Sequence, residues 1–464
     1  MKAPPDVKED LVTPPSVSAT IANYIAQFKL SEAPATAIEN ARRAMIDSIG
    51  VMLAGSTEHA FRIVLEMVLQ ERASPQASIV GHTVRTTPQL AAFANGVALH
   101  AMDYDMTHFI GQPMSPMVAA ILAVAEARGS TQSEILSAYI VGFEVCSRMV
   151  RSNLTQGSSG GWHSVSTLGP IATAAALCRL LESPRQASQN AIGMAASMAS
   201  GVGANYGTMT KPLHCGHAAR NGVVATMLAL DGFTANPKAI EAKSGYFDVL
   251  ARGLAWNLEP FEDLGRSHDL VDRGIWIKRY PCGALLHSGI DAALRLREEL
   301  GSRLEDIAEI HVGVTKYTAK RAWLDYPNSI EAAKFNMNFL VSYALTHGAP
   351  GIAAFSESAI ADERVRALAG RITVGVDAEF AELVEAWPAR VTARLVDGSK
   401  REVVQQFSFE SYKTPLPRAE LEDKFFECAG LVVSRTNAQQ LLALLSTLGE
   451  QPSFERFWPL LRNE

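Results

Sequence analysis

The chain has 464 residues, of which 48% are hydrophobic and 19% charged, a length and composition typical of a folded protein with two domains. A net charge of −6 argues against a nucleic-acid-binding surface, which needs clustered Lys and Arg. It does not exclude a small anionic ligand, because a few local cations are enough to bind one.

The N-terminal residues, the apolar stretches and the cysteines indicate in which cellular compartment the protein is expected. Residues 1–15 are polar and rich in proline, which predicts a loose arm and not a signal peptide. The longest apolar stretches, such as 117–125, are shorter than the roughly 18 residues that cross a bilayer. Five cysteines without a CxxC pair favour reduced thiols. We therefore expect a cytoplasmic protein that does not bind membranes.

Apolar residues recur at helical spacing from Val17 to about residue 254. This spacing predicts helices at 37–53, 90–101, 117–127, 132–150 and 218–230. The sequence from Thr131 to Glu134 has the residue types of a capping box, which would start one of these helices. The first half of the chain is therefore predicted to be mostly helical.

After about residue 270 the pattern changes to strand-like alternation, at 307–315, 371–376 and 389–395, with helices predicted at 289–300 and 335–347. Asp397-Gly398 predicts a hairpin turn into a further strand at 399–404. Residues 418–461 return to helical spacing and are expected to pack on the first domain. The predicted fold is mainly α, with a large all-helical domain (1–270 and 400–464) and a smaller α+β domain (271–399).

The first candidate site segment runs from His100 to His108 and contains Asp103, Asp105 and Thr107. If the preceding helix continues, Asp103 and Thr107 share a face, four residues apart. The cluster could bind a metal or cap a helix. Its ligand spacing matches no standard metal motif, so we expect no metal.

The second segment, 158–167, contains Trp162 and His163 and leads into an apolar helix. A helix start of this kind binds anions through its backbone N–H groups, and Ser166 or Thr167 could cap it. In that interpretation His163 lies where a carboxylate binds. The alternative is a flexible Gly-Ser loop whose histidine packs against Trp162.

Two further segments contain lysines. Lys211 precedes Pro212, just ahead of a helix expected to begin near His214. A lysine near a helix start opposes the helix dipole, which favours a role in ligand binding over one in stability, although a solvated surface lysine remains an alternative. Lys278 and Arg279 form a cationic pair that could bind a carboxylate or lie in a charged hinge.

Together these segments resemble the MmgE/PrpD family, which includes 2-methylcitrate dehydratase, cis-aconitate decarboxylase and iminodisuccinate epimerase. The resemblance covers about residues 17–460 and rests on the order and spacing of motifs at 47–51, 95–107, 161–163, 210–219, 231–234, 278–282 and 332–335. It implies the two-domain fold predicted above, an active site between the domains, a homodimer, and catalysis without metal or organic cofactor.

The family's active-site residues match particular positions of this chain. These are Asp103, Thr107, His163, Lys211, Lys278 and Tyr317, with Tyr326 as an alternative to Tyr317. Two positions depart from the family. Ser115-Pro116, or Pro113 without an insertion, stands where a His-Pro pair is common, and Gly283 stands where the decarboxylases have a histidine.

Both departures remove groups that could protonate a leaving hydroxyl or a new carbanion. Epimerisation needs only removal of a proton beside a carboxylate and its return to the other face. We therefore expect an iminodisuccinate-epimerase-like enzyme acting on a small di- or polycarboxylic acid, with a dehydratase or decarboxylase as the alternative. The residues expected to be catalytic are Lys211, His163, Lys278, Tyr317 and Asp103. The residues expected to bind substrate are Thr107, His108, Ser115, Arg279 and His214.

Two interpretations from other classes remain open at this point. A protein that kept the fold but lost the chemistry would bind carboxylates through Lys211 and Lys278 without turnover. A helical scaffold protein would scatter the polar segments over its surface instead of gathering them around one pocket.

Overall fold

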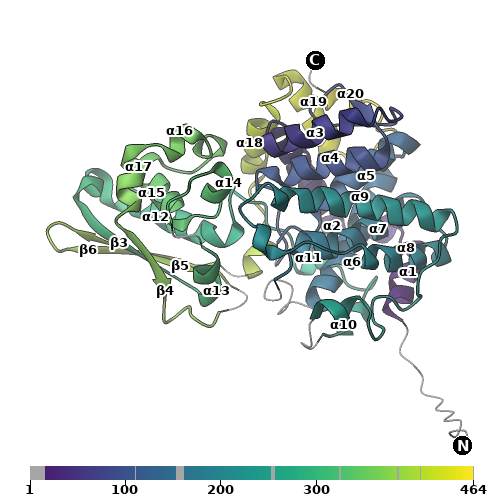
Figure 1. Ribbon diagram of the computed structural model, residues 1–464, viewed down its shortest axis with the longest axis horizontal. Coiled ribbons are helices and arrows are strands. Elements are labelled where there is room, and N and C mark those ends of the chain that lie inside the picture. The colour runs from purple at the N-terminus through teal and green to yellow at the C-terminus, as the bar shows by residue number, and fades with distance from the viewer. Residues whose placement is uncertain are drawn as a thin grey trace, which may run out of the picture.

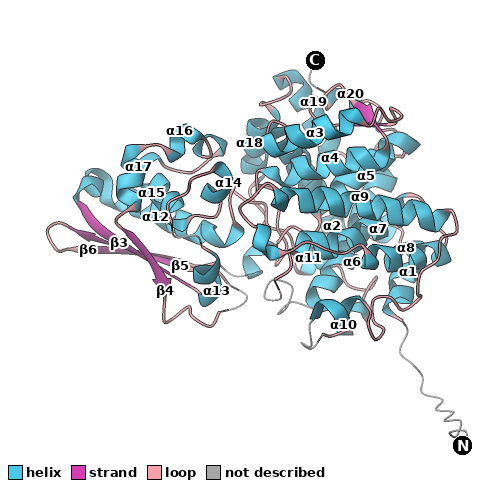
Figure 2. Ribbon diagram, in the orientation of Figure 1, coloured by secondary structure: helices cyan, strands magenta, loops and turns pink. Residues whose placement is uncertain are grey.

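The structure is a computed structural model that describes residues 16–109, 111–152, 161–251, 256–322, 325–383, 386–407 and 409–462. The arm predicted at 1–15, and residues 158–160 of the second candidate segment, lie outside this described part. The chain forms a large helical lobe and a smaller lobe that contains a sheet (Figures 1 and 2). The predicted fold class is confirmed.

The helical domain combines both ends of the described chain. Its helices are α1 (Val17–Gln27), α2 (Ala35–Gly55), α3 (His59–Gln70), α4 (Pro88–Ala101), α5 (Ser115–Arg128), α6 (Gln132–Ser152), α7 (Ser164–Leu180), α8 (Arg185–Ser197), α9 (Thr210–Leu230), α10 (Tyr246–Ala251), α11 (Asp269–Asp272), α18 (Arg418–Ala429), α19 (Arg435–Ser446) and α20 (Phe457–Leu460). A short antiparallel pair, β1 (Ala77–Ser78) and β2 (Arg85–Thr86), is the strand content of this domain within the described residues. The C-terminal helices lie beside the N-terminal ones (Figure 1), and Phe425 and Leu441 share one hydrophobic core with Ile49.

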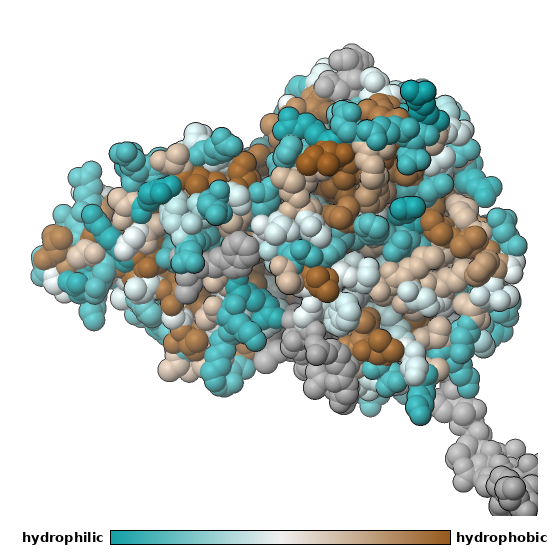
Figure 3. Space-filling view, viewed as in Figure 1, coloured by the Kyte–Doolittle hydropathy of each residue, from teal (hydrophilic) through white to brown (hydrophobic). Residues whose placement is uncertain are grey.

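The local signals read from the sequence are present. The backbone N–H of Thr131 donates to Glu134 Oε2 over 2.7 Å, and the N–H of Glu134 donates to Thr131 Oγ1 over 3.3 Å, so the capping box is confirmed. Helix α5 ends at Gly129, whose φ of 67° is the left-handed conformation that glycine adopts most easily. Among the described residues no helix is long and apolar enough to span a bilayer. The face in Figure 3 shows hydrophilic residues over both lobes.

The smaller domain has a four-stranded sheet in the order β4-β3-β5-β6, with β3 parallel to β4 and antiparallel to β5. Its strands are β3 (Ile307–Val314), β4 (Ile372–Val376), β5 (Ala389–Leu395) and β6 (Lys400–Gln405), and its helices are α12 (His287–Leu300), α13 (Lys316–Arg321), α14 (Ile330–Ala333), α15 (Met337–His347), α16 (Glu357–Ile360) and α17 (Glu363–Ala369). Strand β5 alternates buried and half-buried residues, as its sequence predicts. The hairpin at Asp397-Gly398 joins β5 to β6, so the sheet continues beyond residue 399.

Helices α4 and α9 cross in backbone contact. A Cβ atom added to Gly96 would lie 2.9 Å from the Cα atom of Gly216, and one added to Gly216 would lie 2.4 Å from the carbonyl oxygen of Phe93. Only glycine therefore fits at either position. The close crossing brings the end of α4 near the start of α9, and these two helix ends carry His100 and Lys211.

Gly96→Ala is expected to lower the free energy of unfolding by about 1–3 kcal/mol, because the added methyl group must displace backbone. The measurement is urea denaturation followed by circular dichroism. Gly370→Ala is the matched control, since its Cβ would meet the carbonyl oxygen of Ala367 at an ordinary 3.5 Å. Equal midpoints of urea denaturation for Gly96→Ala and Gly370→Ala would contradict the interpretation that α4 and α9 need glycine where they cross.

Candidate active site

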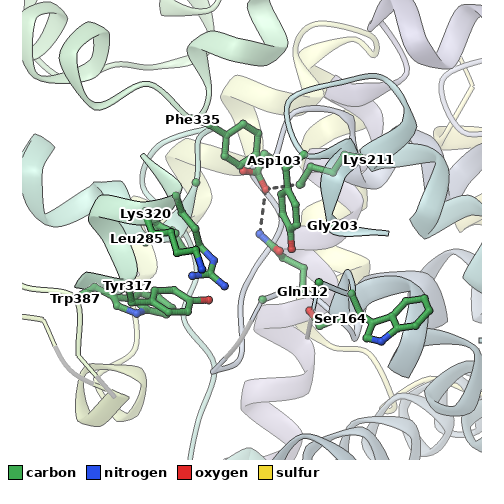
Figure 4. Close-up of a pocket in the computed structure, with 17 residues that line it drawn as sticks. Asp103, Gln112, Ser164, Gly203, Lys211, Leu285, Tyr317, Lys320, Phe335 and Trp387 are labelled. Carbon is green, nitrogen blue, oxygen red and sulfur yellow. Dashed lines mark hydrogen bonds and ion pairs between the residues drawn. The ribbon is translucent and has the colours of Figure 1, made fainter. Parts of the chain in front are cut away.

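A cavity of about 370 Å³ lies between the two domains (Figure 4). The helical domain contributes Asp103, Gln112, Trp162, Ser164, Tyr206 and Lys211 to its lining, and the smaller domain contributes Gly283, Leu285, Tyr317, Lys320, Arg321, Phe335 and Trp387. The lining combines aromatic and apolar surface with several cations. This composition suits a small anionic ligand that has some apolar surface.

Asp103 lies in the turn that follows α4. The helix ends at Ala101. Asp103 has a φ of +52°, a conformation that costs a non-glycine residue about 1–3 kcal/mol and persists only when the surrounding structure holds it. The helix therefore ends where the sequence predicts and does not continue to Thr107, so the condition for a shared helical face of Asp103 and Thr107 is not met. The strained turn instead directs the Asp103 carboxylate towards two lysines.

The Asp103 carboxylate binds two ammonium groups at once. Its Oδ1 atom lies 3.0 Å from Lys211 Nζ and 3.0 Å from Lys278 Nζ, and it also accepts from Gln112 Nε2 over 3.1 Å. Burial alone would raise the pKa of Asp103, but the positive charges of Lys211 and Lys278 outweigh it and hold the pKa far below its usual value. Asp103 therefore stays ionised and is a weak base.

Lys211 lies in the first turn of α9, which begins at Thr210 and not near His214 as predicted. Burial lowers the pKa of Lys211, and the nearby charge of Lys278 lowers it further, against the opposite effect of Asp103. Lys278 is fully buried, and its Nζ also donates to the carbonyl oxygens of Asp103 at 2.7 Å and Cys282 at 3.0 Å. A lowered pKa makes the Lys211 amine available as a base nearer neutral pH.

Behind Lys211 lies a chain of hydrogen bonds formed by His100 and Asp105. His100 Nδ1 lies 3.0 Å from Asp105 Oδ2, and His100 Nε2 lies 2.8 Å from Lys211 Nζ. Burial alone would raise the pKa of Asp105, but His100 and the lysines lower it. The ionised carboxylate therefore accepts a hydrogen bond from the Nδ1–H group of His100. His100 Nε2 is then an acceptor for Lys211. His100 was missed as a site residue, although it belongs to the first candidate segment.

His163 and His214 form a second buried pair. Their Nδ1 atoms are 2.9 Å apart, and the His163 ring faces the His100 ring at a centroid distance of 5.5 Å. Burial lowers the pKa of His163 well below its usual value and that of His214 to about 4, so both are neutral near pH 7. Neither is among the residues that line the cavity, contrary to the catalytic role expected for His163 and the binding role expected for His214.

The helix after His163 does not start as the sequence predicts. Helix α7 begins at Ser164, and His163 is its N-cap residue without a side-chain capping bond. Ser166 and Thr167 therefore lie inside the first turn and do not cap the helix. His163 packs against the Tyr206 ring at 4.9 Å, and Tyr206 lines the cavity although the sequence did not single it out.

Tyr317 lines the small-domain side of the cavity, whereas Tyr326 does not. The hydroxyl of Tyr326 donates to the carbonyl oxygen of Ile360, and its ring packs against Phe339. The structure therefore favours Tyr317 between the two candidate tyrosines. Figure 4 shows the Tyr317 hydroxyl pointing into the cavity, opposite Lys211.

Thr107 and His108 do not line the cavity, contrary to their expected role in binding substrate. Thr107 Oγ1 lies 2.8 Å from the hydroxyl of Tyr412. The two ring nitrogens of His108 lie 2.9 Å from the carbonyl oxygen of Gly274 and 2.9 Å from Ser147 Oγ. Both side chains have their hydrogen bonds inside the protein and hold loops against the helical domain.

Ser115 and Arg279 also lie away from the cavity lining. The Ser115 hydroxyl donates to Asp105 and so supports the orientation of His100. Arg279 is paired with Glu420 at 3.1 Å, and both side chains are about half exposed. The cationic pair expected at 278–279 is thus divided: Lys278 enters the buried cluster, and Arg279 turns to the surface.

His100, Asp103 and Asp105 have ligand atoms within 4.8 Å of one another, a spacing that a metal ion could use. Lys211 Nζ binds His100 Nε2, both lysines bind Asp103 Oδ1, and Ser115 binds Asp105, whereas the buried Asp103 Oδ2 has no hydrogen-bond partner. A divalent cation would have to lie beside two ammonium groups. The residues around this cluster therefore fit an anionic ligand better than a metal.

Lys424, on α18, ties the two loops of the site to the C-terminal helices. Its Nζ lies 2.6 Å from Asp47 Oδ1 and donates to the carbonyl oxygens of Tyr104 at 2.8 Å and Lys278 at 3.0 Å. Tyr104 follows Asp103 in the chain. Lys424 therefore fixes the backbone beside both partners of the Asp103–Lys278 ion pair.

The chain is similar in sequence to enzymes of known activity along most of its length. The chain is 25% identical to human (Homo sapiens) cis-aconitate decarboxylase over 93% of this chain and 92% of the relative. It is 26% identical to cis-aconitate decarboxylase of Aspergillus terreus (strain NIH 2624 / FGSC A1156) over 93% of each chain. It is 24% identical to 2-methylcitrate dehydratase of Cupriavidus necator over 78% of this chain and 77% of the relative.

The models of two family domains cover most of the sequence. The MmgE/PrpD N-terminal domain matches residues 19–259, and the MmgE/PrpD C-terminal domain matches residues 280–449. The first lies within the helical domain, and the second covers the sheet-containing domain and part of the C-terminal helices. The chain belongs to the MmgE/PrpD family.

Proposed function

We propose that this protein removes and returns a proton at the carbon next to a carboxylate of a small di- or polycarboxylic acid, without a cofactor. The observation that carries the proposal is the arrangement of Lys211 and Tyr317, which approach one cavity from different domains (Figure 4). A substrate carbon between them would present one face to an amine and the other to a phenol. Removal of a proton from one face and delivery to the other then needs no large motion of the substrate.

The base in this mechanism is the Lys211 amine. Its lowered pKa leaves more of it unprotonated near neutral pH than is usual for lysine, and His100 Nε2 accepts a hydrogen bond from it. Asp105 holds the imidazole in the required orientation. Burial, together with the charge of Lys211, lowers the pKa of His100, so the imidazole stays neutral and orients the amine without taking its proton.

The negative charge that develops on the substrate carboxylate needs fixed positive partners. Lys278 supplies one ammonium group, and Lys211 becomes a second when it takes the substrate proton, so their cluster with the one carboxylate of Asp103 then has a net positive charge. Asp103 is a weak base, and its role is to position the two lysines. His163, neutral and buried behind Lys211, keeps water and further charge away from the amine.

Epimerisation is the reaction that these residues support best. The histidine that the family's decarboxylases have at the position of Gly283 is missing, and Ser115, at the other departure, is bound to Asp105. The cavity therefore lacks two candidate acids for a leaving hydroxyl or a new carbanion. We assign the proton donor to Tyr317, on the side of the cavity opposite Lys211, since an epimerase needs only one such donor.

A lyase reaction is the second candidate, and the relatives favour it. Both decarboxylases described above match along nearly the full chain, and the third relative is a dehydratase. At 24–26% identity the shared chemistry is proton transfer beside a carboxylate, while the bond that then breaks can differ. A homodimer and a cytoplasmic location, both implied by the sequence, remain predictions.

Incubation of candidate polycarboxylates with the protein in deuterated water tests the proposed reaction. Proton NMR is expected to show loss of the signal of the C–H beside a carboxylate, with the carbon skeleton intact and the stereocentre inverted. Loss of carbon dioxide or water instead would assign the lyase. A failure of every candidate to exchange would favour the non-catalytic carboxylate-binding protein.

Lys211→Met is expected to lower the exchange rate at least about a hundredfold, because it removes the base. The fold should persist, since Asp103 keeps Lys278 and Gln112 as partners. Lys316→Met is the matched control: Lys316 is exposed and pairs with Glu382. Wild-type exchange in Lys211→Met would exclude Lys211 as the base.

Lys278→Met is expected to move the ascending limb of the pH profile of kcat/KM to higher pH. The charge of Lys278 lowers the pKa of Lys211, so its removal raises that pKa and the amine forms only at higher pH. The readout is the pH at which kcat/KM rises, and it does not depend on how far the substitution lowers the maximal rate. An unmoved limb would show that Lys211 is not the titrating base.

A further inference from the structure

Two tyrosines line the cavity, one from each domain. Tyr317 belongs to the smaller domain, whereas Tyr206 directly follows the 3-10 helix Gly203–Asn205 of the helical domain, shortly before Lys211. The Tyr206 side chain is half-buried, and among the described residues its hydroxyl has no hydrogen-bond partner. A phenol of the helical domain is therefore available to a ligand in the cavity.

The Tyr206 ring is held by aromatic contacts with both domains. Its centroid lies 4.9 Å from that of His163 in the helical domain and 6.1 Å from that of Phe335 in the smaller domain, with the rings steeply inclined in each pair. Phe335 also lies against Lys211, whose Nζ atom is 5.6 Å from the centre of the Phe335 ring. Tyr206 and the Lys211 amine therefore pack against the same aromatic side chain. A hydroxyl on a ring held in this way loses little freedom when a ligand binds.

The Tyr206 hydroxyl keeps its proton near neutral pH. Burial raises the pKa of Tyr206, and the nearby Tyr317 and Asp103 raise it further, against the opposite effect of Arg321. A phenol that stays protonated can donate a hydrogen bond to an anionic group. Tyr206 is therefore a donor and not a base.

The proposed reaction benefits from such a donor beside the base. Removal of a proton next to a carboxylate shifts negative charge onto the carboxylate oxygens, and a fixed donor directed at these oxygens lowers the barrier. Lys278 does not line the cavity, and Gln112 Nε2 already donates to Asp103. Lys211 acts as the base. Tyr206 offers an uncommitted hydroxyl close to that base.

We propose that the Tyr206 hydroxyl donates a hydrogen bond to the reacting carboxylate of the substrate and stabilises the charge that develops there when Lys211 removes the proton. The inference rests on the proposed function and adds a catalytic residue to it. Tyr317, on the other side of the cavity, keeps the role of returning a proton to the carbon. The two phenols thus act on different atoms, and the Tyr206 proton stays on the phenol oxygen throughout.

The first test is Tyr206→Phe, which removes the hydroxyl and keeps the ring that packs against His163 and Phe335. In the deuterium-exchange assay, kcat is expected to fall by about 100-fold, while KM changes little, because the hydrogen bond strengthens only as the charge develops. A purely structural role of the hydroxyl would not separate kcat from KM in this way.

The chain offers a matched control in Tyr343. Its ring also lies between a histidine and a phenylalanine, with centroids 5.0 Å from His347 and 5.9 Å from Phe339, but it is not part of the cavity lining. Its hydroxyl, too, has no hydrogen-bond partner within the described part of the chain. Tyr343→Phe is expected to keep the wild-type kcat and KM.

A binding experiment tests the same hydrogen bond without turnover. The dianion of 3-nitropropionate carries a planar nitronate where succinate carries a carboxylate, so it resembles the deprotonated substrate. Isothermal titration calorimetry with freshly prepared nitronate is expected to show at least about tenfold tighter binding than succinate to the wild-type protein. In Tyr206→Phe the affinity for the nitronate should fall by about 10–100-fold, as expected for a lost hydrogen bond to a charged group, while the affinity for succinate changes little.

A Tyr206→Phe variant that keeps its kcat or its preference for the nitronate would overturn the role of Tyr206 and leave the proposed reaction standing. The role would also be refuted by an equal loss in Tyr343→Phe, or by a Tyr206→Phe variant that loses succinate affinity as strongly as nitronate affinity. A wild-type protein that neither exchanges any candidate nor prefers the nitronate would refute the proposed reaction itself, and the role of Tyr206 with it.

Discussion

The ion pairs of Asp103 with Lys211 and Lys278 are the interaction on which the site depends. Burying two ammonium groups beside one carboxylate leaves a positive charge that is costly away from water unless other groups compensate it. The carbonyl oxygens of Asp103 and Cys282 accept from Lys278, and His100 accepts from Lys211. These bonds hold together the end of α4, the start of α9 and the segment that enters the smaller domain. The remaining charge is what a bound carboxylate would neutralise.

Periodicity and local signals predicted the secondary structure well, because they depend on neighbours in the chain. The alternation of β5, the capping box at Thr131 and the hairpin at Asp397-Gly398 are all present. The left-handed turn at Asp103 was not predictable in this way. The ion pairs that hold its carboxylate, with Lys211 and Lys278, are long-range contacts that no local pattern shows.

The family motifs predicted several residues of the candidate site. They did not predict which side chains face the cavity, because tertiary packing determines that. The buried lysines and Asp103 were found, but Thr107 and His108 were assigned to the ligand although both are hydrogen-bonded inside the protein. The partner of Thr107, Tyr412, is 305 residues away, so no local pattern reveals the pair. Lys320 and Arg321 were missed because cations on a short helix resemble an ordinary solvated face.

Lys424 makes the geometry of the candidate site depend on a helix far along the chain. It completes the backbone contacts of the loops at Tyr104 and Lys278, and it lies on α18, 146 residues after Lys278. During synthesis these two loops therefore cannot reach their final positions before α18 has been made and has packed. Chains cut before α18 would carry both lysines without the contacts that fix their loops.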